Sequence, residues 1–590
     1  MSLPTSALSD QEASKSVLLP IGNSSIGTFF FSGARAVDAL LIGSKWASTE
    51  LTYAFPAAAS LYGNAYDDDR LALFEPFNAM QIAVARYAFE LVSSYTLLNF
   101  TELTGEQAGA ATLRLAQTFS EAVPSAEGWF PSELPRAGDI WFGESGQPYY
   151  LTPEKGNWGF ATIMHEIGHT MGLKHGHDDY SQADLGEELG LESPRFGTEA
   201  LPVEKDGQAW SLMTYRPSPG DLTFEGDGFN QPQSYMMFDI AALQYLYGAN
   251  YDHQAEDTVY SWSETTGEMF INGVPQGRPT ENKIFTTIWD GGGNDTYDLS
   301  SYTGPVRINL QPGEFSTFSP EQLVNSRALT GGDGIAPGNV ANALLHYGDT
   351  RSLIENAIGG AGDDTLIGNA ANNVLIGGAG NDLLIGGPGT NTLVGGEGVN
   401  VAGYSLESEQ VSINLDEDVL IVETPSSSDR LSQIELLLFS NEVSLVNAPS
   451  SVSFTNLGGA FDEGFYLRHN PDVAAAIAEG SIASALQHYE SYGAREARDP
   501  NVLFSESWYR RINEDVDAAV ELGDFTNAYE HYLMFGWLEL RDFSAWMSGT
   551  RYLERYDDVL EANFDPLAHY LAHGWEEGRT ITAGDTSFWV

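Results

Sequence analysis

The stretch that decides the fold of the first half of this chain reads His165-Glu-Ile-Gly-His-Thr-Met-Gly-Leu-Lys-His175. On a helix, side chains four residues apart share one face, so His165 and His169 can hold one metal ion. Gly172 can adopt a positive φ and end the helix, after which the chain turns back and brings in His175. Three imidazole ligands with one open position are typical of a catalytic zinc site rather than a structural one.

Glu166 follows the first histidine and faces the same site. Zinc would polarise a water molecule and the scissile carbonyl, and Glu166 would take the water proton and pass it to the leaving amine. His-Glu-x-x-His alone also occurs on ordinary core helices, but Gly172 and His175 in register favour a metal site. His177 has the wrong spacing for a ligand, and we interpret it as a loop residue whose role behind the ligands stays open.

This segment resembles the metzincin peptidases and, within them, the serralysins, which are secreted bacterial zinc proteases. Ser211-Leu-Met-Thr-Tyr215 looks like the Met-turn of that family. The resemblance implies that Met213 forms an apolar floor beneath the metal. It also implies that Tyr215 is a switchable zinc ligand that can hydrogen-bond the oxyanion. A cleft-edge strand that binds extended peptides is implied as well, and its residues would include Ala126, Gly128 and Trp129.

Two further segments, Gly138–Phe142 and Asp239–Gly248, also look like serralysin sequence, and the resemblance covers about residues 36 to 450. The family has Pro-Gly after its third histidine, where this chain has Gly176-His177. This departure concerns the shape of the loop and not the ligand set. Within residues 36–250 we expect an α+β domain of the metzincin type, with a long core helix in Phe74–Leu98.

Residues 359–394 repeat with a period of nine. Each unit approximates Gly-Gly-x-Gly-x-Asp-x-Leu-x, a pattern that builds a parallel β-roll with the apolar residue pointing inward. An irregular Gly-rich loop would not keep this period. Backbone carbonyls of the glycine half and the sixth side chain supply oxygen ligands, which suit calcium. The residues expected to bind several structural calcium ions are Asp290, Gly292, Gly293, Asp295, Glu355, Gly360, Gly362, Asp364, Asn369, Ala371, Asn373, Gly377, Gly378, Ala379, Gly380, Asp382, Gly387, Gly389 and Asn391.

Such arrays resemble repeats-in-toxin proteins, which leave Gram-negative cells unfolded through type I secretion machinery and fold outside with calcium. The resemblance implies a secreted, extracellular protein. Met1–Ser16 lacks the apolar segment of a Sec signal peptide, and no run of apolar residues is long enough for a membrane span. Cysteine is absent from the 590 residues, which excludes disulfides. Asp585–Val590 is compatible with an export tail.

The charge balance restricts the classes of partner. With 27 Lys and Arg against 82 Asp and Glu, the net charge is −55. Nucleic acid is disfavoured, because its phosphates require basic side chains. The acidity fits a chain that needs bound cations to fold or stays soluble in salt. With 42% apolar and 12% aromatic residues, the composition is that of a folded protein.

The last region contains three repeats of about 43 residues. Each repeat has an Asp-Val pair, then a His-Tyr pair, then a glycine four residues after the tyrosine. We expect helix pairs in which these residues cap and pack helices rather than bind metal. A protein partner, a cell-surface glycan and the protease itself all stay open as targets. The recurring residues are Asp472-Val473, Asp515-Val516, Asp558-Val559, His488-Tyr489, His531-Tyr532, His569-Tyr570, Gly493, Gly536 and Gly574.

The sequence therefore predicts a multidomain chain. Residues 1–35 are an N-terminal tail or short pro-segment, 36–250 the α+β zinc protease domain, 251–450 the calcium-binding parallel β-roll or β-sandwich, and 451–590 the α-helical repeat domain with an export signal. The predicted function is a secreted zinc endopeptidase acting on protein and peptide substrates. The alternative is a calcium-dependent surface-binding protein whose protease domain is vestigial or latent.

Overall fold

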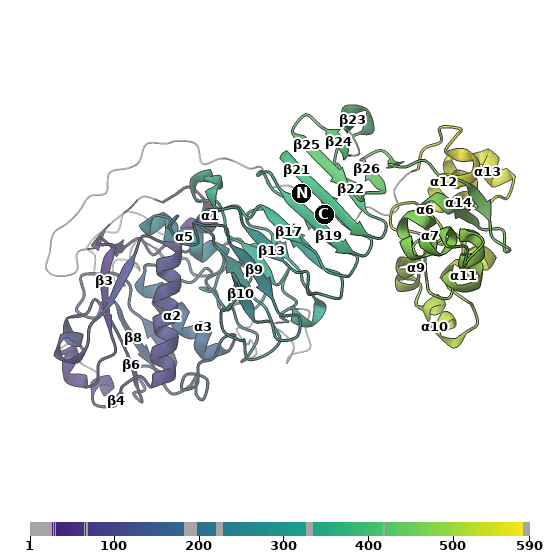
Figure 1. The fold of residues 1–590 in the computed structure, drawn as a ribbon. Coiled ribbons are helices and arrows are strands. Elements are labelled where there is room, and N and C mark those ends of the chain that lie inside the picture. Colours follow the sequence, from purple (N-terminus) through teal and green to yellow (C-terminus); the bar gives the residue numbers. More distant parts are fainter. Residues whose placement is uncertain are drawn as a thin grey trace. The chain divides into compact units, whose positions relative to one another are not determined.

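The computed structural model has an α/β N-terminal region, a β-rich middle region and a C-terminal helical region (Figure 1). It describes residues 26–581 apart from residues 28, 30, 64, 67–68, 182–197, 220–227, 326–333 and 417–418. Most of the predicted N-terminal tail and the predicted export tail lie outside the described residues. Among the described residues, no helix combines the length and apolarity needed to cross a bilayer.

Two compact units make up the chain. The first contains residues up to 302 together with 306–357 and 369–371, and the second contains 303–305, 358–368 and everything from 372 onward. The first unit therefore includes the N-terminal region and the start of the β-rich region. The second includes the nonapeptide strands and the helical repeats.

The N-terminal region is built on a mixed sheet of six strands in the order β5-β3-β6-β8-β7, with β4 beside β6. Strands β5, β3, β6 and β8 pair in parallel, whereas β4 and β7 are antiparallel to their neighbours. Parallel neighbours need crossover connections, so the layout is α/β where α+β was predicted. The strands are β3 (Glu50–Ala54), β4 (Phe74–Glu75), β5 (Asn99–Glu102), β6 (Leu113–Thr118), β7 (Ala126–Gly128) and β8 (Asp139–Phe142).

Helix α2 (Ala79–Tyr95) supplies the crossover between β3 and β5 and runs beside the strands (Figure 1). It begins at Asn78, which accepts the N–H of Gln81 while the Gln81 side chain accepts the N–H of Asn78. The helix is shorter than the predicted Phe74–Leu98, because Phe74 and Glu75 instead pair with β6.

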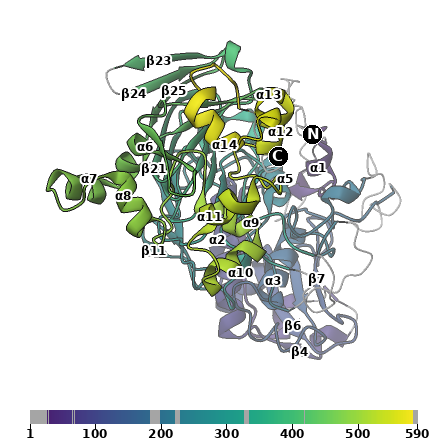
Figure 2. The ribbon, with the colours of Figure 1, turned by 90° about the vertical axis from the view of Figure 1, so that its right-hand side faces the viewer.

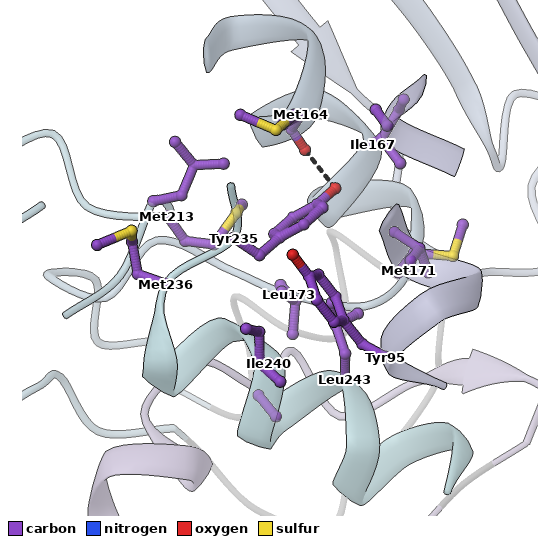
Figure 3. Packing of buried hydrophobic residues seen from close by; sticks show 14 of the residues in the cluster. Tyr95, Met164, Ile167, Met171, Leu173, Met213, Tyr235, Met236, Ile240 and Leu243 are labelled. Carbon is purple, nitrogen blue, oxygen red and sulfur yellow. Dashed lines mark hydrogen bonds between the residues drawn. The ribbon is translucent and has the colours of Figure 1, made fainter. Parts of the chain in front are cut away.

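A buried apolar cluster joins α2, α3 (Trp158–Thr170) and α5 (Met237–Tyr247) (Figure 3). Helix α3 carries His165 and His169. Tyr235 is fully buried in it, and its hydroxyl donates to the Met164 carbonyl at 2.6 Å. This bond ties the segment before α5 to the middle of α3, since a buried phenol needs a partner.

Two short elements precede the sheet, namely the β1 (Ile26–Gly27)–β2 (Lys45–Trp46) pair and α1 (Arg35–Asp38).

The rest of the first unit consists of short strands. Strand β9 pairs in parallel with β13 and antiparallel with β10, and β16 pairs in parallel with β12. The bounds are β9 (Val259–Trp262), β10 (Met269–Ile271), β11 (Val274–Pro275), β12 (Thr286–Ile288), β13 (Thr296–Asp298), β14 (Arg307–Asn309), β15 (Phe315–Ser316), β16 (Val340–Asn342) and β17 (Asn356–Ile358).

In the second unit the nonapeptide strands alternate between two parallel layers. Strands β19, β21 and β25 form one layer (Figure 1), and β18, β20, β22 and β26 form the other. The inward leucines Leu366, Leu375, Leu384 and Leu393 are fully buried, as predicted. The strands are β18 (Thr365–Ile367), β19 (Val374–Ala379), β20 (Leu383–Ile385), β21 (Gly389–Glu397), β22 (Val401–Gly403), β23 (Ser412–Asp416), β24 (Val419–Glu423), β25 (Ser427–Ser432), β26 (Leu436–Leu438), β27 (Val443–Leu445), β28 (Val452–Phe454) and β29 (Ala460–Asp462).

Each of the three C-terminal repeats folds as short helices followed by one π-helical turn that starts at its His-Tyr tyrosine. The buried valines of the Asp-Val pairs pack inside this region. The helices are α6 (Glu463–His469), α7 (Pro471–Ala478), α8 (Ala485–His488), α9 (Glu506–Ile512), α10 (Glu514–Leu522), α11 (Ala528–His531), α12 (Gly549–Arg555), α13 (Asp557–Glu561) and α14 (Pro566–His569), and the turns are Tyr489–Gly493, Tyr532–Gly536 and Tyr570–Gly574.

Candidate metal centre

Helix α3 places two of the predicted ligands on one face and then ends where the sequence requires. Asn157 caps its N-terminus by accepting the N–H of Phe160 at 2.9 Å. At the other end, Gly172 has φ +98°, and a side chain there would meet the Ser44 carbonyl. The chain beyond it is fixed by the bond from the Lys174 N–H to Leu40 O at 2.7 Å. This turn carries His175 back toward the helix.

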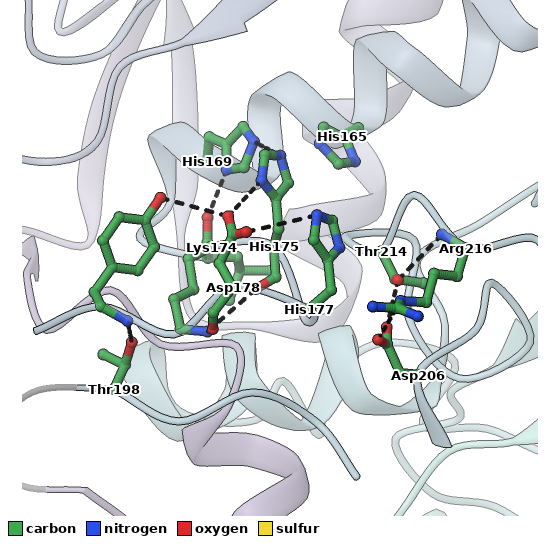
Figure 4. A network of polar contacts seen from close by, with 12 residues as sticks. His165, His169, Lys174, His175, His177, Asp178, Thr198, Asp206, Thr214 and Arg216 are labelled. Carbon is green, nitrogen blue, oxygen red and sulfur yellow. Dashed lines mark hydrogen bonds and ion pairs between the residues drawn. The ribbon is translucent and has the colours of Figure 1, made fainter. Parts of the chain in front are cut away.

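His165, His169 and His175 come together, with one ligand atom from each within 4.8 Å of the others. Figure 4 shows the three rings gathered in one place. Each ring engages its Nδ1 with a different partner: Leu212 O at 2.9 Å, Leu173 O at 2.7 Å and Asp178 Oδ2 at 2.8 Å, respectively. Such partners orient metal-binding imidazoles and leave Nε2 for the metal.

The donor atoms fit a zinc ion. His165 Nε2 is buried without a hydrogen-bond partner, and the Nε2 atoms of His169 and His175 lie 3.1 Å apart. Burial lowers the pKa of His165 to about 3 and that of His169 well below the usual range, and nearby His175 adds to both effects. The His165 and His169 rings are thus held neutral, which is the state that binds a metal.

Glu166 is also buried beside this cluster, and its Oε2 has no hydrogen-bond partner. Burial and, to a smaller extent, the negative charge of Glu127 together raise the pKa of its carboxyl to about 8, and the backbone N–H of Gly128 opposes the rise. A buried carboxyl with an open oxygen and a raised pKa is a proton acceptor suited to catalysis near neutral pH.

Met213 packs beneath the cluster against the helix. A Cβ added to Gly168 would lie 2.6 Å from Met213 Sδ, so only glycine leaves room for the thioether there. Asp239 of α5 holds the turn, since it accepts the Ser211 hydroxyl and the Leu212 N–H, each at 2.6 Å. The predicted Met-turn residues therefore lie next to the metal-site helix.

Tyr215 lies at the same cluster. Its ring centroid is 4.3 Å from that of His175 and 5.5 Å from that of His165. His177 stacks on His175 with an interplanar angle of 5° and lies 3.6 Å from Asp178. His177 is therefore a loop residue in contact with His175.

Strand β7 borders the same site. It forms the edge of the sheet and packs against α3 (Figure 2). Gly128 lies so close to Glu166 that a Cβ there would be 3.2 Å from the Glu166 carboxylate. Trp129 continues the strand, and the Arg136 guanidinium lies 3.6 Å from its ring centroid. Of the three residues predicted for the edge strand, Ala126 and Gly128 lie in β7, Trp129 follows it, and Gly128 is the one that approaches Glu166.

The predicted calcium ligands include buried carboxylates with open oxygens. Asp382 is fully buried, its Oδ2 has no hydrogen-bond partner, and burial with the charges of Asp364 and Asp363 raises its pKa to about 8. In the first unit, Asp295 likewise has an open Oδ2 and a pKa raised to about 8 by burial and by Asp290. Carboxylate oxygens are the ligands that a hard cation prefers, and a bound cation would offset the cost of burying these charges.

Other predicted calcium ligands have hydrogen-bonding roles. Asn373 N–H donates to Asn391 Oδ1 at 2.9 Å, and Asn391 donates its amide to Asp429 at 2.8 Å. The Glu355 carboxylate accepts the Asp295 N–H at 2.8 Å, and Ala371 N–H donates to Asn369 Oδ1 at 2.9 Å. Glycines in the array pack on carbonyls of the turn eighteen residues before, as Gly378 does on Gly360 and Gly380 on Gly362.

Sequence reasoning missed several supporting residues. Asp178 was not singled out, although it hydrogen-bonds His175, and its position three residues after the ligand is the signal that could have indicated it. Lys174 is fully buried and donates to the backbone carbonyls of His175 and Asp178 at 3.1 and 2.6 Å (Figure 4). These contacts hold the loop that carries His175.

Comparison with known proteins shows similarity to one family over part of the chain. Residues 249–456 match the model described as Peptidase M10 serralysin C terminal. Metallopeptidase AprA of Pseudomonas marginalis is 33% identical over 328 residues, which are 54% of this chain and 59% of that protein. Serralysin G of Dickeya chrysanthemi is 32% identical over 324 residues, again 54% and 59%.

The chain thus spans less than two thirds of the length of these relatives. Among solved structures, the extracellular lipase LipA from Serratia marcescens is 21% identical and covers 16% of this chain and 17% of its own, with a TM-score of 0.15. That score is too low to bear on the fold.

Proposed function

Because this chain belongs with the serralysin-type M10 metalloproteases, whose C-terminal domain it carries over residues 249–456, we propose that it is a secreted zinc endopeptidase. The observation that carries the proposal is the convergence of three oriented imidazoles beside a buried glutamate. His165, His169 and His175 would hold the ion through Nε2, with Tyr215 as a switchable fourth ligand. A bound zinc ion supplies a Lewis acid for peptide hydrolysis.

Glu166 is the proposed general base. Its open Oε2 can accept a proton from water, and its raised pKa lets the same atom return that proton to the departing amine near neutral pH. Tyr215 offers a phenolic O–H beside the histidines that can donate to the developing oxyanion. Met213 and Asp239 keep the surrounding turn in place without touching substrate.

Peptide substrates would bind along β7. As the edge strand, β7 can accept an extended peptide through main-chain hydrogen bonds, which gives affinity with modest sequence preference. The close approach of Gly128 to Glu166 would bring such a peptide to the general base.

We further propose that calcium binds the nonapeptide array after type I export from a Gram-negative cell, and so completes folding outside. The buried Asp382 and Asp295 carboxylates, with their open oxygens, support cation binding. The rival function is a calcium-dependent surface-binding protein with a vestigial or latent protease domain. The presence of all three histidines, Glu166 and Tyr215 favours activity.

The test compares the full chain, refolded with calcium, with Glu166→Gln and with Glu154→Gln, which changes an exposed glutamate. We expect wild type and Glu154→Gln to bind zinc and cleave casein. Glu166→Gln should bind zinc yet lose about 10³-fold or more in kcat/KM, because general-base catalysis is removed. Zinc content is measured by metal analysis.

Wild-type protein that holds zinc and cleaves nothing, both as the full chain and after removal of residues 1–35, would favour the rival function. Activity that appears only after this removal would show that the tail keeps the chain latent.

A further inference from the structure

A cavity of about 200 Å³ lies inside the second unit, apart from the candidate metal centre. The turns of the nonapeptide array form one wall, and the second and third helical repeats form the other. Its lining includes polar and aromatic side chains from both walls, namely Asp363, Asn381, Ser505, Trp508, Arg511 and Trp546.

On the side of the cavity formed by the array, side chains from the fifth position of alternate nonapeptides form a hydrogen-bonded ladder. Asp363 and Asn381 lie eighteen residues apart, at the fifth position of the first and third nonapeptides. The Asn381 N–H donates to Asp363 Oδ1 at 2.9 Å, and Asn381 Oδ1 accepts the N–H of Val399, two turns further on, at 2.7 Å. The ladder therefore holds these polar side chains in fixed orientations.

Hydrogen bonds join this wall to the second repeat. Arg511 Nη1 donates to Asp363 Oδ2 at 2.7 Å, and the Asn381 amide donates to Ser505 Oγ at 3.1 Å. The Arg511 side chain is still 49% exposed, so much of its guanidinium can reach a ligand. The Arg511–Asp363 pair balances its own charge and offers donors and acceptors together.

Two half-buried tryptophans line the same cavity, and the repeat pattern does not require them. At a spacing of 43 residues, Trp508 corresponds to Phe465 in the first repeat and to Arg551 in the third. Trp546 corresponds to Leu503 in the second repeat. Both indoles pack partly against the apolar core of this unit and also face the cavity, at positions where the repeats differ.

From this combination we propose that the cavity binds a neutral saccharide unit of a polysaccharide. The C–H face of a sugar ring packs on an indole, and its hydroxyl groups need fixed donors and acceptors in one place. A phosphate or another anion is disfavoured, because two carboxylates, those of Asp363 and Asp364, line the cavity beside the single guanidinium of Arg511. The Asp363 carboxylate pairs with Arg511, and the Asp364 carboxylate accepts the Gly360 N–H. The proposal is independent of the proposed protease activity.

Affinity electrophoresis of the calcium-loaded full chain tests this. The net charge of −55 drives migration in native gels, which would contain dextran, mannan, galactan or soluble β-glucan. We expect at least one polysaccharide to retard the wild type. Trp508→Ala and Trp546→Ala should each weaken binding about tenfold through loss of an aromatic platform, and Arg511→Gln should weaken binding through loss of hydrogen bonds.

The matched control is Trp537→Ala in the second repeat, because the Trp537 indole donates to Leu533 O and does not line the cavity. This variant should be retarded like the wild type. A thermal unfolding curve like that of the wild type shows that a variant is folded. If the tryptophan variants do not fold, Arg511→Gln serves as the test variant, because it changes a partly exposed side chain. A wild type that none of the four polysaccharides retards overturns the proposal, as does equal retardation of folded wild type, Trp508→Ala, Trp546→Ala and Arg511→Gln.

Discussion

Individual side chains that are distant from the histidines in the sequence fix the orientation of the candidate metal centre. Asp239 is buried in α5, yet it accepts the N–H groups of Leu212 and Met236 and the hydroxyl of Ser211. Leu212 in turn presents its carbonyl to His165. One carboxylate thus orients a ligand through a chain of backbone contacts, since buried polar groups must be paired.

We therefore expect Asp239→Asn to destabilise the protein by about 1–3 kcal/mol, because an amide nitrogen cannot accept the N–H groups that Asp239 Oδ2 accepts. Casein hydrolysis should fall with it, since His165 loses its support. Urea unfolding and kcat/KM are the measurements, and Asp252→Asn, at an exposed aspartate of the same unit, is the control. Equal unfolding midpoints for the two variants would contradict this account.

At the scale of elements, each helical repeat depends on one close contact. A tyrosine of the first helix hydrogen-bonds the repeat histidine, as Tyr509 does with His531 at 3.2 Å. The hydroxyl also lies against the glycine that ends the π-helical turn, so a Cβ on Gly536 would overlap Tyr509 Oη. The recurring His and Gly residues therefore pack helices, in agreement with the interpretation from the sequence.

Gly536→Ala should lower the stability of this repeat by about 1–3 kcal/mol through overpacking. In a Tyr509→Phe background Gly536→Ala should lower the stability less, because the Tyr509 hydroxyl that the alanine Cβ would overlap is absent. Thermal unfolding of the four proteins of this double-mutant cycle measures the difference. Strictly additive costs would show that the contact with the hydroxyl is not the cause.

At the scale of the whole molecule, the acidic composition and the nonapeptide array point to dependence on cations. A chain with a net charge of −55 repels itself when compact. Burial of carboxylates such as Asp382 adds a desolvation cost that a bound cation would offset. Folding of the array is thus expected to depend on calcium.

Chelation of calcium with EGTA should lower the unfolding temperature and reduce the strand signal in circular dichroism. Asp382→Asn should raise the calcium concentration at half-refolding severalfold, because one ligand charge is lost. Asp416→Asn, at an exposed strand residue, should not. Refolding of the wild type that is the same with and without calcium would refute the expectation.

Periodic sequence features determined much of this protein without the structure. A helical period puts His165 and His169 on one face, a nine-residue period sets the array with its buried leucines, and a 43-residue period sets the helical repeats. The helical and nine-residue periods are local, because each depends on residues a few positions apart whose relative geometry follows from the backbone alone. The 43-residue period is recognised directly from its recurring residues.

The tertiary structure alone decided the rest. The parallel pairing of the first sheet, the support of His165 by Asp239 through Leu212, and the meeting of Trp508 with Asp363 all join residues distant in the chain. No local period specifies such contacts, because they arise only when separate elements pack and must satisfy their buried polar groups together.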